Sequence, residues 1–214
     1  MLKIRMMSVE HEYSVIGHSR SSWGRRLGAI AGGVAAFGVL VAGAVLGLAE
    51  QLGLGKHVPE IVLWPFTAAS VYAGVHWLFN RFIWRWRWFS KVLGVPDLSG
   101  RWRCKGQTLN PVRGAVANWE GELVISQSWE KIRVHLCTAN SESQSKAASL
   151  IYEPGTGFRL LYSYFNLPGL GQRLHAHIGY SEIVFDEELS RGNGEYFNNK
   201  GRVTYGTMML ERLV

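Results

Sequence analysis

The chain of 214 residues contains only two cysteines, Cys104 and Cys137. Two cysteines are too few for a disulfide framework, and their spacing matches no zinc-binding motif. Charged residues make up 18% of the chain, below the roughly 25% that is typical of soluble domains. Hydrophobic residues make up 47%, which excludes disorder as the main state. The mean hydropathy of +0.01 therefore describes either an ordinary globule or the average of an apolar and a polar part.

Sequence motifs of common enzymes are also missing. The chain has no GxGxxG dinucleotide fingerprint, no P-loop and no G-x-S-x-G nucleophile elbow. His135, His175 and His177 would suit a three-histidine metal site, but no carboxylate stands at a recognisable spacing from them. The acidic cluster 186–188 resembles a solvated strand end rather than the paired carboxylates of a hydrolase. We therefore predict a protein that is not an enzyme and has no catalytic residue, metal or cofactor.

The positive charge lies in one part of the chain. The sequence has 23 Lys and Arg against 16 Asp and Glu, a net charge of +7. Residues 1–96 hold 10 basic and 4 acidic residues, whereas residues 97–214 hold 13 and 12. The basic character therefore belongs to the N-terminal part, and the C-terminal part is almost neutral.

Two long uncharged segments predict a helical membrane hairpin, which we assign to residues 27–92. Residues 27–48 are 22 uncharged residues drawn from Ala, Gly, Val, Leu, Ile and Phe. Residues 61–80 are a second uncharged segment of 20 residues, and residues 49–60 connect the two. At about 1.5 Å per residue, each helix would cross the roughly 30 Å hydrocarbon core of a bilayer. The alternatives are two buried helices of a soluble protein, or a signal peptide cleaved after Ala49.

Basic residues flank the hairpin on one side. Arg20, Arg25 and Arg26 precede the first span, and four basic residues follow the second span between positions 81 and 91. The connection 49–60 contains a single lysine. By the positive-inside rule, both termini and the C-terminal domain are predicted to be cytoplasmic.

Small residues in the first span predict close helix packing. Gly28 with Gly32, and Gly43 with Gly47, are GxxxG pairs whose members share one helix face. Such faces let two helices approach closely in lipid. The partner is either the second span of the same chain or a helix of another protomer.

Tryptophan and arginine alternate in the segment 84–88, directly after the second span. Interleaved aromatic and basic residues occur in nucleic-acid-binding proteins, but Trp and Arg also gather at the membrane–water interface. The position of the segment at the end of a span favours an interfacial anchor. We therefore predict the lipid bilayer as a partner, and neither DNA nor RNA.

After the helix break at 94–97, short alternating runs are separated by Gly, Asn, Pro and Ser. The predicted strands are 100–108, 119–127, 131–138, 145–153, 158–165, 173–179, 181–187, 194–198 and 203–211. Such a succession predicts an all-β domain over residues 97–214, a small antiparallel up-and-down β-barrel of about eight strands. A two-sheet sandwich is the alternative. Residues 1–26 are left as a cytoplasmic N-terminal segment.

Polar and aromatic residues recur at alternate positions of these strands. Tyr162, Tyr164 and Asn166 share one strand face, and Ser141 and Ser143 share another. Aromatic rings stack on bases, amides hydrogen-bond to base edges, and hydroxyl groups contact phosphates. The alternative is that the tyrosines pack the barrel interior and the serines belong to a solvated loop. Together these residues make an interior more polar than packing requires, which favours a ligand-binding site.

The order and spacing of several short motifs resemble a known family. The motifs are Asp97–Trp102, Ile125–Trp129, Thr138–Ser143, Tyr162–Pro168, His177–Gly179 and Gly194–Asn199. Attached to a helical hairpin, this series resembles the effectors of bacterial CBASS anti-phage operons that combine two transmembrane helices with a β-barrel, the SMODS-associating family. The resemblance covers nearly the whole chain from about residue 27 onward.

The resemblance implies a function. A cyclic di- or trinucleotide, made by a CD-NTase enzyme after phage infection, would bind inside the cytosolic barrel and promote homo-oligomerisation. The spans would then disrupt the bacterial inner membrane and abort the infection. The ligand-binding candidates that the resemblance suggests are Gln127, Ser141, Ser143, Tyr162, Tyr164, Asn166, His177, Tyr196, Asn198 and Arg202. The alternative functions are a membrane-tethered barrel that binds a lipid or small molecule without toxicity, and a membrane enzyme.

Overall fold

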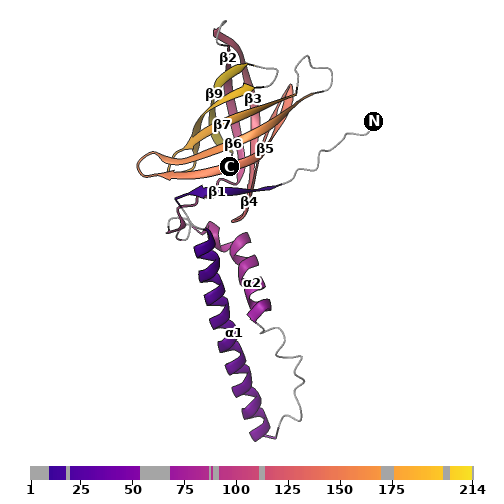
Figure 1. Cartoon of the computed structure of the whole chain (residues 1–214), viewed down its shortest axis with the longest axis vertical. Coiled ribbons are helices and arrows are strands. Elements are labelled where there is room, and N and C mark those ends of the chain that lie inside the picture. Colours follow the sequence, from indigo (N-terminus) through magenta and orange to yellow (C-terminus); the bar gives the residue numbers. More distant parts are fainter. Residues whose placement is uncertain are drawn as a thin grey trace, which may run out of the picture. The chain divides into compact units, whose positions relative to one another are not determined.

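The computed structural model describes residues 10–17, 20–53, 68–86, 88, 92–110, 114–169, 176–199 and 203–213. The chain divides into two compact units (Figure 1). Residues 19–86 form a helical unit, and residues 1–18 together with 87–214 form a β-sheet unit.

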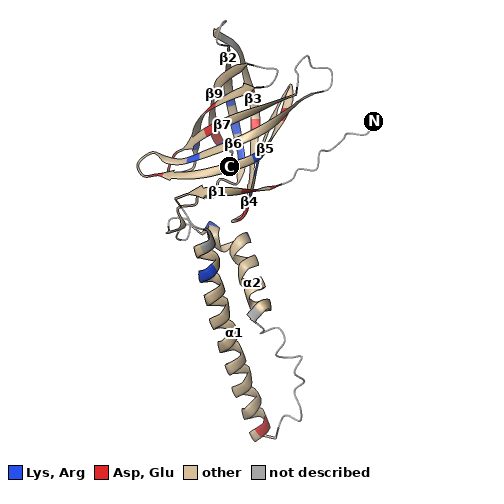
Figure 2. Ribbon diagram, viewed as in Figure 1, with Lys and Arg blue, Asp and Glu red and all other residues tan. Residues whose placement is uncertain are grey.

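The helical unit consists of α1 (Arg20–Gln51), α2 (Ala68–Arg81) and a short 3-10 helix, η3 (Ile83–Arg85). Within α1, the 30 residues Ser22–Gln51 contain a stretch with a mean hydropathy of 2.3, long and apolar enough to cross a membrane. Figure 2 shows charged residues only toward the two ends of this helix. The predicted first span, 27–48, lies within α1.

The helices α1 and α2 pack side by side (Figure 1). Leu27, Ala31 and Ala35 follow one another at helical spacing and form a buried stripe on α1. A methyl group on Gly28 would lie 3.9 Å from the ring of Tyr72 in α2. Gly28 therefore faces α2 in this unit.

The second predicted span, 61–80, is described only from residue 68 onward, where it forms α2. Its first seven residues, 61–67, lie outside the described residues. Part of the predicted interfacial segment 84–88 belongs to η3, in which the Trp84 side chain is buried.

The β-sheet unit is a closed barrel of nine strands. The strands are β1 (His11–Ile16), β2 (Gly100–Asn110), β3 (Gly114–Gln127), β4 (Lys131–Thr138), β5 (Ser141–Glu153), β6 (Gly157–Pro168), β7 (His177–Phe185), β8 (Arg191–Asn199) and β9 (Thr204–Leu213). Strands β2 to β9 pair with their neighbours in the sequence, and β9 returns to pair with β2. The predicted antiparallel barrel of about eight strands is thereby confirmed, and the sandwich alternative is excluded.

The ninth strand, β1, was not predicted. Near their shared turn, β4 and β5 pair directly, from His135 with Gln144 to Cys137 with Glu142. Farther from the turn β4 and β5 separate, and β1 pairs antiparallel with the start of β4 and parallel with β5. A bulge between Ser145 and Ala147 lies where β5 leaves β4. The N-terminal segment thus completes the barrel wall.

One pair of predicted strands is wrong. The predicted strands 173–179 and 181–187 correspond to the single strand β7, which spans residues 177–185. Buried and less buried positions alternate along β7 without interruption, so no turn divides it. Residues 170–175 lie outside the described residues.

One end of the barrel is filled by apolar side chains. Trp102 and Phe185 are fully buried, with ring centroids 4.9 Å apart. Leu93, Val95 and Leu98, in the segment that leads into β2, are fully buried as well. Burial of each such side chain contributes about 1.5–3 kcal/mol, so this end forms the stable core of the unit.

Candidate ligand-binding site

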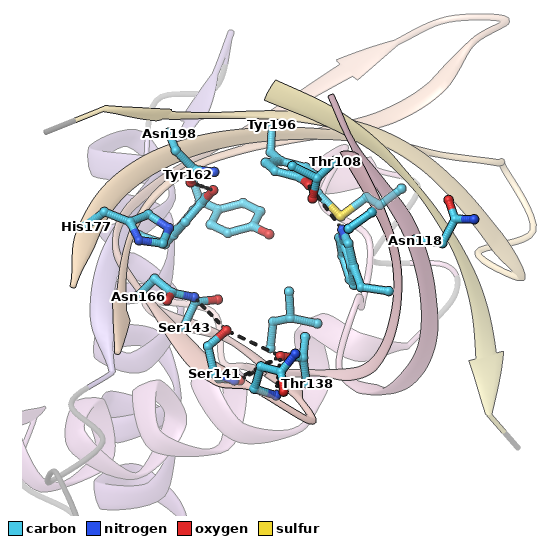
Figure 3. Close-up of a pocket in the computed structure, with 16 residues that line it drawn as sticks. Thr108, Asn118, Thr138, Ser141, Ser143, Tyr162, Asn166, His177, Tyr196 and Asn198 are labelled. Carbon is cyan, nitrogen blue, oxygen red and sulfur yellow. Dashed lines mark hydrogen bonds between the residues drawn. The ribbon is translucent and has the colours of Figure 1, made fainter. Parts of the chain in front are cut away.

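The barrel interior contains a cavity of about 510 Å³ (Figure 3). Every strand from β2 to β9 contributes at least one lining residue. Side chains of a strand alternate between its two faces, so each strand presents every second residue to the interior. On β6, for example, Tyr162, Tyr164 and Asn166 line the cavity.

Three large aromatic rings lie over glycines of the neighbouring strand. The pairs are Trp119 with Gly106, Tyr164 with Gly179, and Tyr196 with Gly206. A methyl group on any of these glycines would overlap the ring of its partner. The missing side chains allow the rings to pack against the wall, which keeps the interior hollow.

Hydrogen bonds hold two tyrosine hydroxyl groups in place. Tyr196 Oη accepts a hydrogen bond from Trp119 Nε1 at 3.1 Å and lies 2.7 Å from Thr108 Oγ1. Tyr164 Oη donates to Asn198 Oδ1 at 2.8 Å. The positions of these polar groups are therefore set before any ligand arrives.

Asn166 has an unused hydrogen-bonding atom. Its Nδ2 donates to Ser141 Oγ at 3.2 Å. Its Oδ1 is buried, and no donor among the described residues reaches it. Leaving a buried acceptor unpaired costs about 1–3 kcal/mol. Because Asn166 lines the cavity, a ligand that presents an N–H or O–H group there would recover this cost (Figure 3).

The cavity is polar but almost free of charged groups. None of the described lining residues is Lys, Arg, Asp or Glu, and His177 is the one imidazole among them. Burial raises the pKa of Tyr162, so its hydroxyl stays protonated and can donate a hydrogen bond. Burial likewise raises the pKa of the Cys104 thiol to about 12, which keeps this interior cysteine protonated.

Eight of the ten candidate residues line this cavity. They are Ser141, Ser143, Tyr162, Tyr164, Asn166, His177, Tyr196 and Asn198. They come from four consecutive strands, β5 to β8, which pair side by side in the barrel. A ninth candidate, Arg202, lies outside the described residues.

The tenth candidate, Gln127, is buried outside the cavity lining. Its Nε2 donates to Tyr13 Oη at 3.2 Å and to the Pro96 carbonyl at 3.1 Å. Its Oε1 accepts a hydrogen bond from the Leu98 amide at 2.9 Å. Gln127 thus ties β1 and the segment before β2 to β3, an arrangement that suits a structural role.

Other lining residues were not singled out from the sequence. Apart from Asn140, in the turn between β4 and β5, they come from β2, β3, β4 and β9, and among them are Thr108, Trp119, Thr138 and Met208. Strand alternation does place these residues on the inner face. It contains no signal for which end of each strand borders the cavity.

The hypothesis of a three-histidine metal site is not supported by the described residues. His177 lines the cavity. His135 lies on β4 between Val134, which is buried, and Leu136, which lines the cavity, so strand alternation turns His135 outward. The two imidazoles are on opposite sides of the barrel wall. His175 lies outside the described residues.

Comparisons with known proteins match both parts of the chain. Residues 22–85 match the family model described as "Cap15, TM helices", and residues 93–212 match the one described as "Cap15, cyclic dinucleotide receptor domain". CD-NTase-associated protein 15 of Yersinia aleksiciae is 39% identical over 206 residues, which cover 95% of this chain and 97% of that protein. The chain therefore belongs to the Cap15 family.

Proposed function

We propose that this protein is a membrane effector of a CBASS anti-phage system whose barrel binds a cyclic dinucleotide. The observation that carries the proposal is the polar, aromatic-lined cavity within residues 93–212. Its volume of about 510 Å³ lies within the roughly 300–1,000 Å³ that is usual for small-molecule sites. An apolar lipid in this cavity would leave the buried Oδ1 of Asn166 without a hydrogen-bond donor, so the lining favours a polar ligand.

The lining supplies partners for each part of a cyclic dinucleotide. The tyrosine rings and Trp119 offer surfaces on which bases stack. The unpaired Oδ1 of Asn166 accepts a hydrogen bond from a base edge. The protonated Tyr162 hydroxyl and the Ser143 hydroxyl are donors for phosphate oxygens. Arg202 is the candidate cation for the phosphates.

The proposed role is reception of a ligand, without catalysis. The described lining residues include no pair of carboxylates and no nucleophile beside a general base. Tyrosine, asparagine and serine groups that are already held by hydrogen bonds are suited to recognising a ligand rather than transforming it.

The hairpin is the proposed membrane-disrupting part. The apolar helix α1 supports insertion into the bacterial inner membrane, and the basic flanks favour two spans with the barrel and both termini in the cytoplasm. Ligand binding would promote homo-oligomerisation. Methyl groups on Gly32, Gly43 or Gly47 would meet no described atom within 4 Å, which supports a glycine face available to another helix.

Calorimetric titration of the full chain in detergent with a panel of cyclic di- and trinucleotides tests the proposal. We expect at least one cyclic dinucleotide to bind, with one site per chain. Asn166→Ala should weaken that affinity by at least about tenfold, because it removes the acceptor offered to the base.

Gln127→Ala is the matched control, because Gln127 is also buried but lies outside the cavity lining. It should lower the free energy of unfolding by about 1–3 kcal/mol, since it leaves the Leu98 amide unpaired, while the ligand affinity stays unchanged. If no nucleotide binds and native mass spectrometry finds a co-purified lipid, the lipid-binding alternative replaces the proposal.

A further inference from the structure

Three side chains that commonly bind metals meet on the outer face of the barrel. They are His135 and Cys137 of β4 and Glu142 of β5. Cys137 and Glu142 are cross-strand partners, and His135 stands two residues before Cys137, so all three project from the same face of the hairpin. His135 and Cys137 are half-buried and Glu142 is exposed, which leaves the cluster accessible from solvent.

The distances between the ligand atoms fit a tetrahedral zinc site. His135 Nε2 lies 3.5 Å from Cys137 Sγ and 3.6 Å from Glu142 Oε2. Ligand atoms of all three residues lie within 4.8 Å of one another. Zinc bonds of about 2.0–2.2 Å to nitrogen or oxygen and about 2.3 Å to sulfur place neighbouring ligands of a tetrahedron about 3.3–3.6 Å apart. One ion could therefore contact all three groups after small side-chain rotations, with the strands in place.

The donor set selects the class of metal. A thiolate, an imidazole and a carboxylate together suit zinc, whereas magnesium and calcium prefer oxygen ligands alone. We propose that His135, Cys137 and Glu142 bind one Zn²⁺ ion, with water as the fourth ligand. Binding requires the thiolate form of Cys137, so the thiol proton is released to solvent when the metal enters.

Stability of the apo barrel gives little reason for this cluster. The 3.6 Å contact between His135 and the exposed Glu142 carboxylate contributes little to the folded state, because solvent screens it. A half-buried cysteine beside these two groups adds a weak hydrogen-bonding partner. Metal binding gives all three residues a common role.

The site would connect the outer surface to the cavity wall. Thr138 follows Cys137 and Ser141 precedes Glu142, and both of these neighbours line the cavity on the inner face (Figure 3). An ion bound across the hairpin would hold β4 and β5 together at that wall. Binding of the ion requires no nucleotide, so the metal proposal and the ligand proposal can fail separately.

Cobalt titration of the full chain in detergent, expressed without a histidine tag, tests the site. Co²⁺ is the probe because it occupies zinc sites and reports thiolate ligation through ultraviolet charge-transfer absorption. We expect one equivalent of Co²⁺ to produce this band together with the visible absorption of tetrahedral cobalt. Addition of Zn²⁺ should abolish both.

Two variants and a matched control separate this site from other metal binding. Cys137→Ser should abolish the charge-transfer band, and Glu142→Gln should weaken cobalt binding at least about tenfold, since losing even an outer-shell partner costs about 10–100-fold. The control is Cys104→Ala, because Cys104 is the other cysteine and is buried 3.8 Å from the Met208 sulfur. This variant should keep the band.

Circular dichroism shows whether each variant retains the barrel, and Glu142→Gln changes only an exposed side chain. A wild-type chain that gives no thiolate band with Co²⁺ would overturn the proposal. So would a folded Cys137→Ser variant with an unchanged band.

Discussion

At the scale of single residues, the cavity depends on positions that lack a side chain. Tyr164 lies over Gly179 of the neighbouring strand, and Tyr196 lies over Gly206 in the same way. Each glycine lets an aromatic ring pack against the barrel wall. With a side chain in place of the glycine, the ring would have to project across the interior. The glycines are thus as much a part of the site as the aromatic residues that line it.

Gly179→Ala should close part of the cavity. The added methyl group would overlap the Tyr164 ring, which must leave the wall and give up its 2.8 Å hydrogen bond to Asn198. Overpacking of this kind costs about 1–3 kcal/mol of unfolding free energy. A ring displaced into the interior should also lower the affinity for the cyclic nucleotide at least about tenfold. Thermal unfolding and calorimetric titration measure the two effects.

A double-mutant cycle provides the control for this prediction. In a chain that already carries Tyr164→Ala, the overlap is gone, so Gly179→Ala should cost little additional stability. An equal loss of stability in both backgrounds would contradict the proposed role of the glycine.

Single residues also show how far the site could be predicted from the sequence. Alternation predicted that Tyr162, Tyr164 and Asn166 share a face, and all three line the cavity. The same alternation could not separate Gln127 from Trp119, which lie eight residues apart on the inner face of β3. A period of two identifies the face of a strand. The position of a residue along the barrel axis depends on the register of its strand with the partner strands. The local sequence pattern carries no information about this register.

At the scale of secondary-structure elements, β1 illustrates a second limit of prediction. The strand has six residues, and its partners β4 and β5 follow more than a hundred residues later. A short strand has little stability by itself, so its local sequence carries only a weak signal. Tyr13 and Val15 become buried only because β4 and β5 separate and leave a gap for β1.

Deletion of residues 1–16 should open the barrel wall along the gap between β4 and β5. Without β1, the backbone groups of Ala148–Ile151 and the start of β4 lose their partners. Hydrogen exchange at these amides should accelerate, and the midpoint of thermal unfolding should fall, while exchange in β7 and β8 stays slow. A chain that lacks only residues 1–9 retains β1 and serves as the control. Equal exchange in the two truncated chains would show that β1 does not hold the wall.

At the scale of the whole molecule, the near-zero mean hydropathy is an average over two unlike units. The helical unit contains the apolar helix α1, and the other unit is the barrel, whose basic and acidic residues almost balance. Two segments of the chain connect the barrel to the helices: the end of β1, which precedes α1, and the segment that follows η3. Gln127 hydrogen-bonds to Tyr13 in the first connection and to Pro96 and Leu98 in the second. Both covalent paths to the helices therefore start from one buried cluster of the barrel.

The glycine face of α1 is the proposed link between ligand binding and membrane damage. Gly28 faces Tyr72 of the same chain, whereas methyl groups on Gly43 and Gly47 would meet no described atom within 4 Å. Replacing both Gly43 and Gly47 by leucine should therefore leave the packing of α1 against α2 intact. It should block the close approach of another helix, because bulky side chains keep helix backbones apart in lipid.

In cells that also express the proposed partner, a CD-NTase, we expect the wild-type chain to depolarise the inner membrane. The chain with Gly43→Leu and Gly47→Leu should lose most of this effect. Cross-linking in isolated membranes should show a matching loss of oligomers. Val41→Leu is the control, because at about 100° per residue it lies on nearly the opposite side of the helix from Gly43. It should depolarise the membrane as the wild type does. The double leucine variant must be compared with the wild type at equal amounts of membrane-inserted protein. If it depolarises the membrane as strongly as the wild type, the glycine face has no part in the mechanism. Ligand binding to the barrel would then act on the membrane through another surface.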